Sequence, residues 1–493
     1  MMSRLHQSWR LVAAVAALIL VEAAAMGVRS DRIPFEPYSS CRVVVDAGSS
    51  GTRFFVFSSP AASADLHDAF PHLTPGLSDT PPLQAYTYMR EALYKVQESI
   101  DAATRPTCYV HVYATAGMRL LSATAQSEIY NQLYLDFTND RNMALRMARE
   151  DLRTISGDEE AYFLAMAANF LDTRVESDLA PSNVDLFGAL DLGGGSTQIV
   201  FDVKERWRQN ARRKAIPHQK PLNASEFYLH SFLGYGTKHM HAQVLLHVAN
   251  TTTNDTTVPN PCWFSGYTDL NQTGTGRAAE CIAILQDILG QDNAACPTGT
   301  FCALQSQPQP FVTGSFYAVS VFYIATIFAR DVVAQLAPQL SYDWPAPSVL
   351  EIESAANLVC DAQYNDLAKM SFDHTPLAKL HRRCLDLCYV TALLKAYGFG
   401  LDEHRVVFVN RIRDSPLVWA TGAYLVEQAR ASAAYENALV TYLSSQVELG
   451  LPVGRHIALL MLAFAIAALT ATVHRAHGRH GTQAIEFWPD TRK

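Results

Sequence analysis

The stretch from Val43 to Phe57 constrains the fold more than any other part of the chain. Its letters, VVVDAGSSGTRFFVF, run from a β-branched segment through a short polar turn into a second apolar segment, which predicts a β-hairpin. The turn contains a carboxylate, two glycines, three hydroxyl side chains and an arginine. Because glycine lets backbone amides approach phosphate oxygens closely, this turn is typical of a phosphate-binding loop.

A second loop repeats this design. The segment DLGGGSTQ, residues 191–198, again follows an apolar strand with an aspartate, glycines and hydroxyl side chains. Either loop alone is explained as well by an ordinary glycine turn, but two such loops predict a site in which both bind phosphate. Asp46 and Asp191 end the two strands, so we expect them to share a divalent cation, Mg²⁺ or Ca²⁺, held through water.

The 493-residue chain alternates strand-like and helical patterns, which predicts an α/β architecture. We expect a strand over 108–113 and helices over 88–103, 125–139, 316–337, 377–397 and 416–443. The formal net charge of −8 argues against a nucleic-acid-binding protein and is compatible with an anionic small-molecule substrate.

Both ends of the chain carry apolar segments. Basic residues precede the apolar run 11–21 and small residues follow it, which predicts a signal peptide over 1–25, with a retained N-terminal anchor as the alternative. The apolar run 457–473 precedes a basic flank, which predicts a transmembrane helix and a cytoplasmic tail, 474–493. The alternative, a buried helix of a soluble core, is disfavoured because no polar residue interrupts the run before Thr470.

Potential modification sites support a main, catalytic part of the chain that lies in the lumen of the secretory pathway, such as the Golgi, or at the cell surface. Four N-x-S/T sequons predict glycosylation at Asn223, Asn250, Asn254 and Asn271. Near-neighbour spacing of six cysteines predicts the disulfides Cys262–Cys281, Cys296–Cys302 and Cys360–Cys384. Cys41, Cys108 and Cys388 are expected to be unpaired, because Cys108 falls in a predicted core strand and Cys388 in a helix. A metal site at Cys384 and Cys388 is disfavoured because no second cysteine pair accompanies them.

Five motifs carry a resemblance to a known family. VVVDAGSSGTR, ATAGMRLL, ISGDEEA, LDLGGGSTQ and WATGA occur in the order of the apyrase conserved regions. Between Arg42 and Tyr442 the chain therefore closely resembles the apyrase (nucleoside triphosphate diphosphohydrolase) family, and CLDLCYVTALLKAYGFGLD resembles the guanosine-diphosphatase and plant apyrase branch. The resemblance implies two RNase H-like (actin-like ATPase) lobes with a nucleotide cleft between them. Lobe I would span 38–156, lobe II with its disulfides and glycans 157–409, and the return to lobe I 410–448.

The resemblance also implies a reaction, the hydrolysis of the terminal phosphate of nucleoside tri- or diphosphates, and roles for individual residues. Glu160 would take a proton from the attacking water, which Ser196 and Gln198 would orient. The resemblance implies a structural role for Arg119. Glu159 is interpreted as a charge at the N-terminus of a helix. The phosphate-binding residues would be Ser49, Ser50, Gly51, Thr52, Arg53, Thr115, Ala116, Gly117, Gly193, Gly194, Gly195 and Ser196.

Some alternatives stay open at this stage. The resemblance places a nucleobase against Tyr323, Tyr397 or Phe399, with core packing as the alternative for each ring. An exopolyphosphatase of the same superfold also carries an SGxEEA run, and Ala161 fits that pattern. A nucleotide-binding receptor without turnover is the other rival, which the intact Glu160 disfavours. The preferred base, and tri- versus diphosphate preference, stay undecided.

Overall fold

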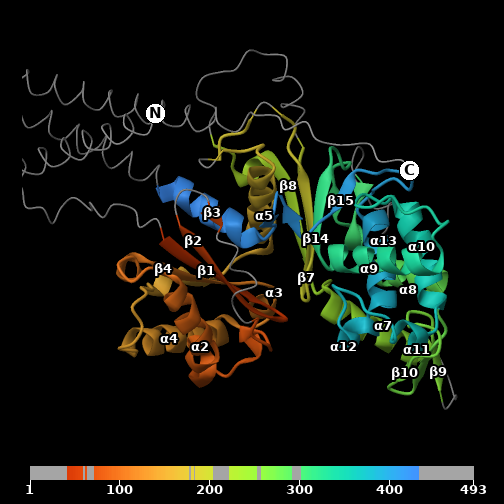
Figure 1. Ribbon diagram of the computed structural model, residues 1–493, viewed down its shortest axis with the longest axis horizontal. Coiled ribbons are helices and arrows are strands. Elements are labelled where there is room, and N and C mark those ends of the chain that lie inside the picture. The colour runs from red at the N-terminus through yellow and green to blue at the C-terminus, as the bar shows by residue number, and fades with distance from the viewer. Residues whose placement is uncertain are drawn as a thin grey trace, which may run out of the picture. The chain divides into compact units, whose positions relative to one another are not determined.

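Two five-stranded mixed sheets with the same strand order form the frame of the computed structural model (Figure 1). The first, in the order β3-β2-β1-β4-β5, consists of β1 (Cys41–Gly48), β2 (Gly51–Ser58), β3 (Ala62–Ser63), β4 (Tyr109–Ala114) and β5 (Leu152–Thr154). The second, in the order β15-β14-β6-β7-β8, consists of β6 (Gly188–Leu192), β7 (Ser196–Asp202), β8 (Phe227–Leu233), β14 (Phe316–Ser320) and β15 (Val406–Phe408). Each sheet has its first strand in the centre, with antiparallel strands on one side and parallel strands on the other.

Helices accompany both sheets, which confirms the predicted α/β class. Those described are α2 (Ala85–Ser99), α3 (Ala116–Arg119), α4 (Ala123–Asn139), α5 (Gly157–Leu171), α7 (Thr237–Thr251), α8 (Ala278–Leu289), α9 (Val321–Leu336), α10 (Val349–Asp361), α11 (Tyr364–Leu367), α12 (Leu377–Leu380), α13 (Arg383–Ala396) and residues 419–431. Short strands outside the two sheets are β9 (Val258–Asn260), β10 (Thr268–Asp269), β11 (Gln272–Gly274), β12 (Phe301–Cys302), β13 (Pro308–Gln309), β16 (Arg411–Ile412) and β17 (Ser415–Pro416).

The structure describes residues 41–58, 62–63, 72–176, 179–182, 184–203, 221–251, 257–290 and 301–431. The predicted signal segment 1–25, membrane helix 457–473 and tail 474–493 lie outside these ranges, as do Asn254 and Cys296. Across the described ranges, no helix combines the length and apolar character that a bilayer crossing requires. The sequon residues Asn223, Asn250 and Asn271 are all exposed.

The first sheet is covered on both faces. Val43 and Val45 alternate with neighbours that point to the other face of the sheet, and both are fully buried in a core shared with α2 and α4. On the other face, Phe57 stacks on Tyr424 of the helical segment 419–431, with ring centroids 4.7 Å apart. Figure 1 shows this blue segment beside β2 and β3, and α2 and α4 on the far side of the sheet.

The second sheet lies between α5 and a larger group of helices. Helix α5 packs against β6, β7 and β8, whereas α9 covers the opposite face of β14 and β6 (Figure 1). Helices α10 and α13 pack against α9, and α8 packs against α10 and α13. Alternation along β6 sends Leu190 and Leu192 into the core with α9 and α13. The intervening residue, Asp191, therefore faces α5.

Two predicted helices have different boundaries in the structure. The predicted helix 316–337 begins as the strand β14, because Phe316–Ser320 pairs in parallel with β6 and β15 and is enclosed by both. A short, continuously apolar run does not distinguish such a strand from a buried helix. The predicted helix 377–397 is divided into α12 and α13.

The disulfides confirm two predicted bridges and correct one expectation. Cys262–Cys281 and Cys360–Cys384 are both present, and Cys388 is free and buried. Cys302 is disulfide-bonded, and its predicted partner Cys296 is outside the described residues. The expectation that Cys41 and Cys108 are unpaired is wrong, because they form a disulfide with their Cα atoms 4.7 Å apart. The cause is the parallel pairing of β1 with β4, which aligns Arg42 with Tyr109 and so brings the two preceding cysteines together.

Both sheets belong to one compact unit, Met1–Glu427, and a second unit, Gln428–Lys493, follows it. Of the second unit only residues 428–431 are described. Within the first unit, Trp419 stacks on Phe163 of α5 with ring centroids 6.5 Å apart. The boundaries of the two lobes stay predictions.

Candidate active site

The first loop is the tip of the β1–β2 hairpin. Gly48 pairs with Gly51, so Ser49 and Ser50 form the turn. Two residues further from the tip, Asp46 lies opposite Arg53, and Arg53 Nη1 is 3.6 Å from Asp46 Oδ2. Asp46 is buried, so this loop places a carboxylate and a guanidinium on one face of the sheet.

Two other residues of this loop, Gly51 and Thr52, are closely enclosed by neighbouring residues. A Cβ atom on Gly51 would lie 2.2 Å from the ring of His72 and 2.5 Å from the Leu73 carbonyl oxygen, so only glycine fits. Thr52 is fully buried, and its hydroxyl accepts a hydrogen bond of 3.1 Å from Tyr88. The Thr52 side chain is therefore not brought together with Asp46 and Arg53, although the sequence predicted a phosphate-binding role for it.

The second loop has the same construction. Asp191 lies opposite Gln198 in the β6–β7 ladder, the place that Asp46 and Arg53 occupy in the first hairpin. The amide of Gly193 donates to the Ser196 carbonyl oxygen at 3.0 Å and closes the turn. Asp191, Ser196 and Gln198 are all buried.

Three loops from the two sheets converge. A Cβ atom on Gly194 would lie 2.9 Å from Ser49 Oγ, and one on Gly195 would lie 2.7 Å from the Cβ atom of Ala116. A Cβ atom on Gly117 would lie 3.0 Å from Ser49 Cα. The absence of side chains at these glycines therefore allows the approach, which brings together most of the predicted phosphate-binding residues.

The third loop joins β4 to α3 and contains Thr115. Its amide donates to the Ala47 carbonyl oxygen at 3.2 Å, which attaches this loop to the end of β1. Thr115 is buried, and Arg119 lies at the end of α3. The pairing of β1 with β4 thus fixes the first and third loops relative to each other.

Helix α5 supplies the carboxylate next to these loops. Ser156 caps the helix: its Oγ accepts from the Glu159 amide at 3.0 Å, and the Glu159 carboxylate accepts from the Ser156 amide at 2.9 Å. Glu159 also pairs with Arg153 at 2.8 Å. This arrangement confirms the interpretation of Glu159 as a helix N-terminal charge. Glu160, one residue further, is buried instead.

Two side chains, one from helix α3 and one from strand β7, hold the Glu160 carboxylate. Oε2 accepts a hydrogen bond from Arg119 Nη2 and another, at 3.1 Å, from Gln198 Nε2. Burial raises the pKa of Glu160 to about 8; the charge of Arg119 opposes this rise, while Asp191 and Asp46 add to it. A carboxyl group with a pKa near neutrality is suited to accept a proton from water.

The two aspartates have the properties of a cation site. Burial raises the pKa of Asp46 to about 6, against Arg53 and with a further rise from Asp191. Burial also raises the pKa of Asp191, which Ser320 and Arg53 oppose. The Oδ1 atoms of both aspartates are buried and have no hydrogen-bond partner among the described residues. Unpaired carboxylate oxygens that repel one another fit a hard divalent cation such as Mg²⁺ or Ca²⁺.

The three aromatic residues of the nucleobase prediction are buried in the described structure. Tyr397 is fully buried, and its hydroxyl lies 2.9 Å from Thr197 Oγ1. Phe399 packs edge-on against Phe316, with ring centroids 4.9 Å apart. Tyr323 is also buried, and its hydroxyl lies 3.2 Å from His374 Nε2. These contacts favour core packing, the alternative, and the nucleobase role stays a prediction.

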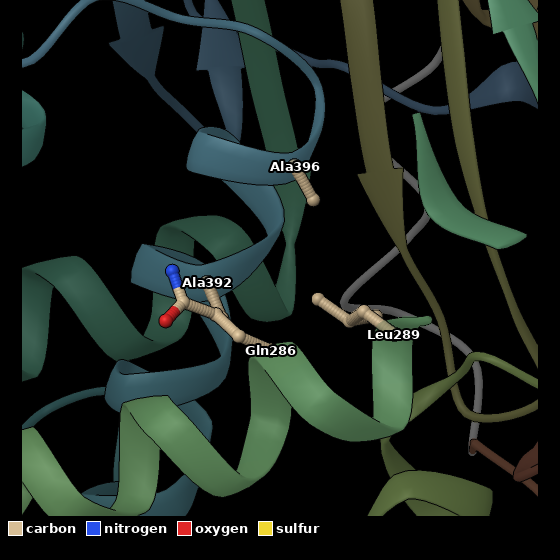
Figure 2. A pocket seen from close by; sticks show the side chains of 4 residues that line it. All are labelled: Gln286, Leu289, Ala392 and Ala396. Carbon is tan, nitrogen blue, oxygen red and sulfur yellow. The ribbon is translucent and has the colours of Figure 1, made fainter. Parts of the chain in front are cut away.

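A small pocket lies elsewhere, between α8 and α13 (Figure 2). It has a volume of about 120 Å³ and is lined by Gln286, Leu289, Ala392 and Ala396. None of these side chains is titratable, so the pocket offers no acid, base or metal ligand.

Sequence reasoning missed one residue of the site, Ser231 on β8. Its Oγ accepts hydrogen bonds from Gln198 Nε2 at 3.2 Å and from Arg119 Nη1 at 3.4 Å. The motif HSFLGYG contains Ser231, but a single serine on a strand does not predict such contacts. The register that pairs Ser231 with Gln198 is the signal that would have identified it.

Comparisons with known proteins agree with one another. The model of the GDA1/CD39 (nucleoside phosphatase) family matches residues 37–441. The chain is 24% identical over 478 residues to ectonucleoside triphosphate diphosphohydrolase 2 of Gallus gallus, covering 87% of this chain and 89% of the relative. It is 27% identical over 434 residues to probable apyrase 4 of Arabidopsis thaliana, covering 80% of each. Nucleoside triphosphate hydrolases from Neospora caninum share the fold, with a TM-score of 0.54 at 14% identity over 88% of this chain and 100% of theirs.

Proposed function

Because this chain belongs to the GDA1/CD39 family of nucleoside phosphatases, we propose that it removes the terminal phosphate of nucleoside tri- and diphosphates by direct attack of a water that Glu160 deprotonates. One observation carries this proposal. A buried glutamate with a raised pKa lies next to two aspartates that have unpaired oxygens, at the convergence of three glycine-containing loops. Cleavage of a phosphoanhydride needs charge neutralisation, an in-line water and a base. The loop amides and a cation held by the aspartates would supply the first, and Glu160 would be the base that acts on the water.

Phosphate binding is assigned to the loops. Backbone amides at Ser49, Ser50 and residues 193–195 would donate to phosphate oxygens, because glycine-containing turns present several amides in one direction. Arg53 adds a positive charge on the face that carries Asp46. The buried Thr52 is left out of this role.

Water activation is assigned to Gln198, Ser196 and Glu160. Gln198 directs its amide nitrogen to Glu160 Oε2 and to Ser196 Oγ, at 3.1 Å and 2.8 Å. Its Oε1 atom is buried without a partner among the described residues, and it would accept a hydrogen bond from the attacking water. The second water proton would pass to the Glu160 carboxylate, which must be deprotonated when the substrate is bound.

Asp46 and Asp191 would hold the divalent cation, Mg²⁺ or Ca²⁺, through water. When bound, the cation would neutralise charge on the phosphate oxygens. It would also relieve the repulsion among Asp46, Asp191 and Glu160, each of which has a raised pKa.

The location proposed for the reaction is the lumen of the secretory pathway or the cell exterior, with 457–473 as a membrane anchor. Three described disulfides and three exposed sequon residues support an oxidising compartment. Protease protection and glycosidase treatment of membranes that contain the full chain test this location.

A phosphate-release assay tests the activity itself. ADP, ATP, GDP, UDP and inorganic polyphosphate are compared with Mg²⁺, with Ca²⁺ and with EDTA. We expect release from nucleotides only when a divalent cation is present. Release from polyphosphate alone would identify an exopolyphosphatase, and tight nucleotide binding without release would identify a receptor.

A further inference from the structure

Ser231 occupies a central place in the hydrogen-bond network of the site. It lies directly opposite Gln198 in the antiparallel β7–β8 ladder. A Cβ atom on Gly157, in the first turn of α5, would lie 2.2 Å from the Ser231 Cβ and Oγ atoms and 2.4 Å from Arg119 Nη1. Strand β8, helix α5 and helix α3 therefore meet at this hydroxyl group.

The hydrogen bonds at this point fall into a definite pattern. Arg119 has two donor nitrogens in use, one on Ser231 Oγ and the other on Glu160 Oε2. Gln198 Nε2 is likewise within hydrogen-bond distance of both Ser231 Oγ and Glu160 Oε2, at 3.2 Å and 3.1 Å. One serine oxygen and one carboxylate oxygen therefore share the same two donor side chains.

This pattern makes the two oxygens of Glu160 unequal. Both donors act on Oε2, and Oε1 receives no hydrogen bond from the side chains that the structure describes. An oxygen that already accepts two hydrogen bonds, one from a guanidinium, is a poor proton acceptor. Oε1 is consequently the atom left to take the proton from water.

We infer that Ser231 is a positioning residue, which selects the oxygen of Glu160 that acts as the base by anchoring Arg119 and Gln198 on the other oxygen. The inference deepens the proposed function and rests on it. Without the hydroxyl, the guanidinium and the amide lose their common acceptor and can move away from Oε2, so that Oε2 and Oε1 are no longer distinguished. The same movement would turn Gln198 Oε1 away from the attacking water.

The test compares Ser231→Ala and Ser231→Cys with the wild-type enzyme. Cysteine has the same connectivity as serine, but its larger sulfur is a weak acceptor, so it fills the space of the hydroxyl while weakening its hydrogen bonds. We expect both variants to lower kcat about ten- to a hundredfold, since both lose hydrogen bonds to charged or polar donors, and to change KM less than about threefold. Ser354→Ala, which removes an exposed hydroxyl on α10, is the matched control and should retain full activity.

The pH profile is the readout that a purely structural role would not move. The charged groups that act on Glu160 are Arg119, Asp191 and Asp46, and Arg119 lowers its pKa. A less firmly held Arg119 lowers that pKa less, so the acid limb of kcat/KM should move to higher pH in Ser231→Ala. An unchanged limb, or a Ser231→Cys variant as fast as wild type, would overturn the inference and leave the proposed function intact. A wild-type protein that releases no phosphate would overturn both.

Discussion

Glu159 and Glu160 are neighbours in sequence, but their surroundings shift their pKa values in opposite directions. Although partial burial acts against it, the pKa of Glu159 is lowered, because the Ser156 amide and Arg153 bind its charged form. Burial raises the pKa of Glu160 to about 8 in spite of Arg119. Environment, more than residue type, decides which of them accepts a proton at neutral pH.

We predict that Glu160→Gln lowers kcat by about two to four orders of magnitude, the usual contribution of a general base, while nucleotide affinity stays nearly unchanged. Steady-state phosphate release and equilibrium nucleotide binding check this prediction. Glu159→Gln is the control and should retain most of the activity, with some loss of stability at the start of α5. Wild-type turnover in folded Glu160→Gln protein would remove the base assignment.

The raised pKa of Glu160 also predicts how the reaction depends on pH. The base works only when deprotonated, so kcat/KM should increase as pH rises through the Glu160 pKa. That pKa is raised from 4.5 to about 8, so the increase should extend across neutrality. The profile is measured from about pH 5 to about pH 9 at fixed free cation concentration. A profile in which kcat/KM falls as pH rises from about 5 to about 8 would contradict the assignment.

At the residue scale, motifs predicted the parts of the site that form contiguous loops. The family match confirms the assignment that motif order suggested. Ser231 was missed because its contacts come from strand pairing, which a single sequence does not show. The role of the three aromatic rings stays a prediction, since their residue type suits base stacking and core packing equally well.

At the scale of single elements, the loops depend on glycines whose surroundings differ. Gly195→Ala would place a methyl group 2.7 Å from the Ala116 side chain, whereas Gly193→Ala finds its nearest contact at 3.5 Å. We predict that Gly195→Ala loses at least about tenfold more kcat/KM than Gly193→Ala, because overpacking separates the converging loops. Equal losses in the phosphate-release assay would contradict the close approach.

The Cys41–Cys108 disulfide also belongs to the scale of single elements, because it links two strands. It joins the starts of β1 and β4 and closes a loop with a sequence separation of 67 residues. We predict that the double variant Cys41→Ala, Cys108→Ala lowers the free energy of unfolding by about 2–4 kcal/mol. Urea denaturation measures the change, and Cys388→Ser, which alters a free buried thiol, controls for the loss of a buried sulfur. An unchanged denaturation midpoint in the double variant would argue against the bridge.

Sequence patterns predicted most elements, and the errors share a cause. The β1–β2 and β6–β7 hairpins and α4 were expected from the hydrophobic pattern and the glycine turns, and the interpretation of Glu159 as a helix N-terminal charge implied the start of α5. The start of the predicted helix 316–337 and the pairing of Cys41 were wrong, because both depend on which strands are parallel neighbours. Parallel pairing joins segments far apart in the chain, and no local pattern encodes it.

For the molecule as a whole, the three buried carboxyl groups predict that cation binding and stability are coupled. Their folded-state pKa values are raised, so the folded state holds protons that the unfolded state has released. In EDTA, stability should therefore fall as pH rises from about 4 to about 8, by up to about 1.4 kcal/mol per pH unit for each group.

A divalent cation should offset this loss, so the increase in Tm caused by Mg²⁺ or Ca²⁺ should be larger at about pH 8 than at about pH 5. Differential scanning calorimetry measures it, and the Asp46→Asn, Asp191→Asn double variant should lose most of the increase together with activity. A cation-induced increase that persists in the double variant, or activity that survives EDTA, would contradict the shared cation site.

The equal strand order of the two sheets has a consequence for the symmetry of the site. Each central strand carries an aspartate at the same place in its hairpin. The residue opposite that aspartate breaks the equivalence, because it is Arg53 in one hairpin and Gln198 in the other. An assembly of two identical copies would present the same group from both sides. In this single chain, one hairpin presents a positive charge and the other a neutral amide.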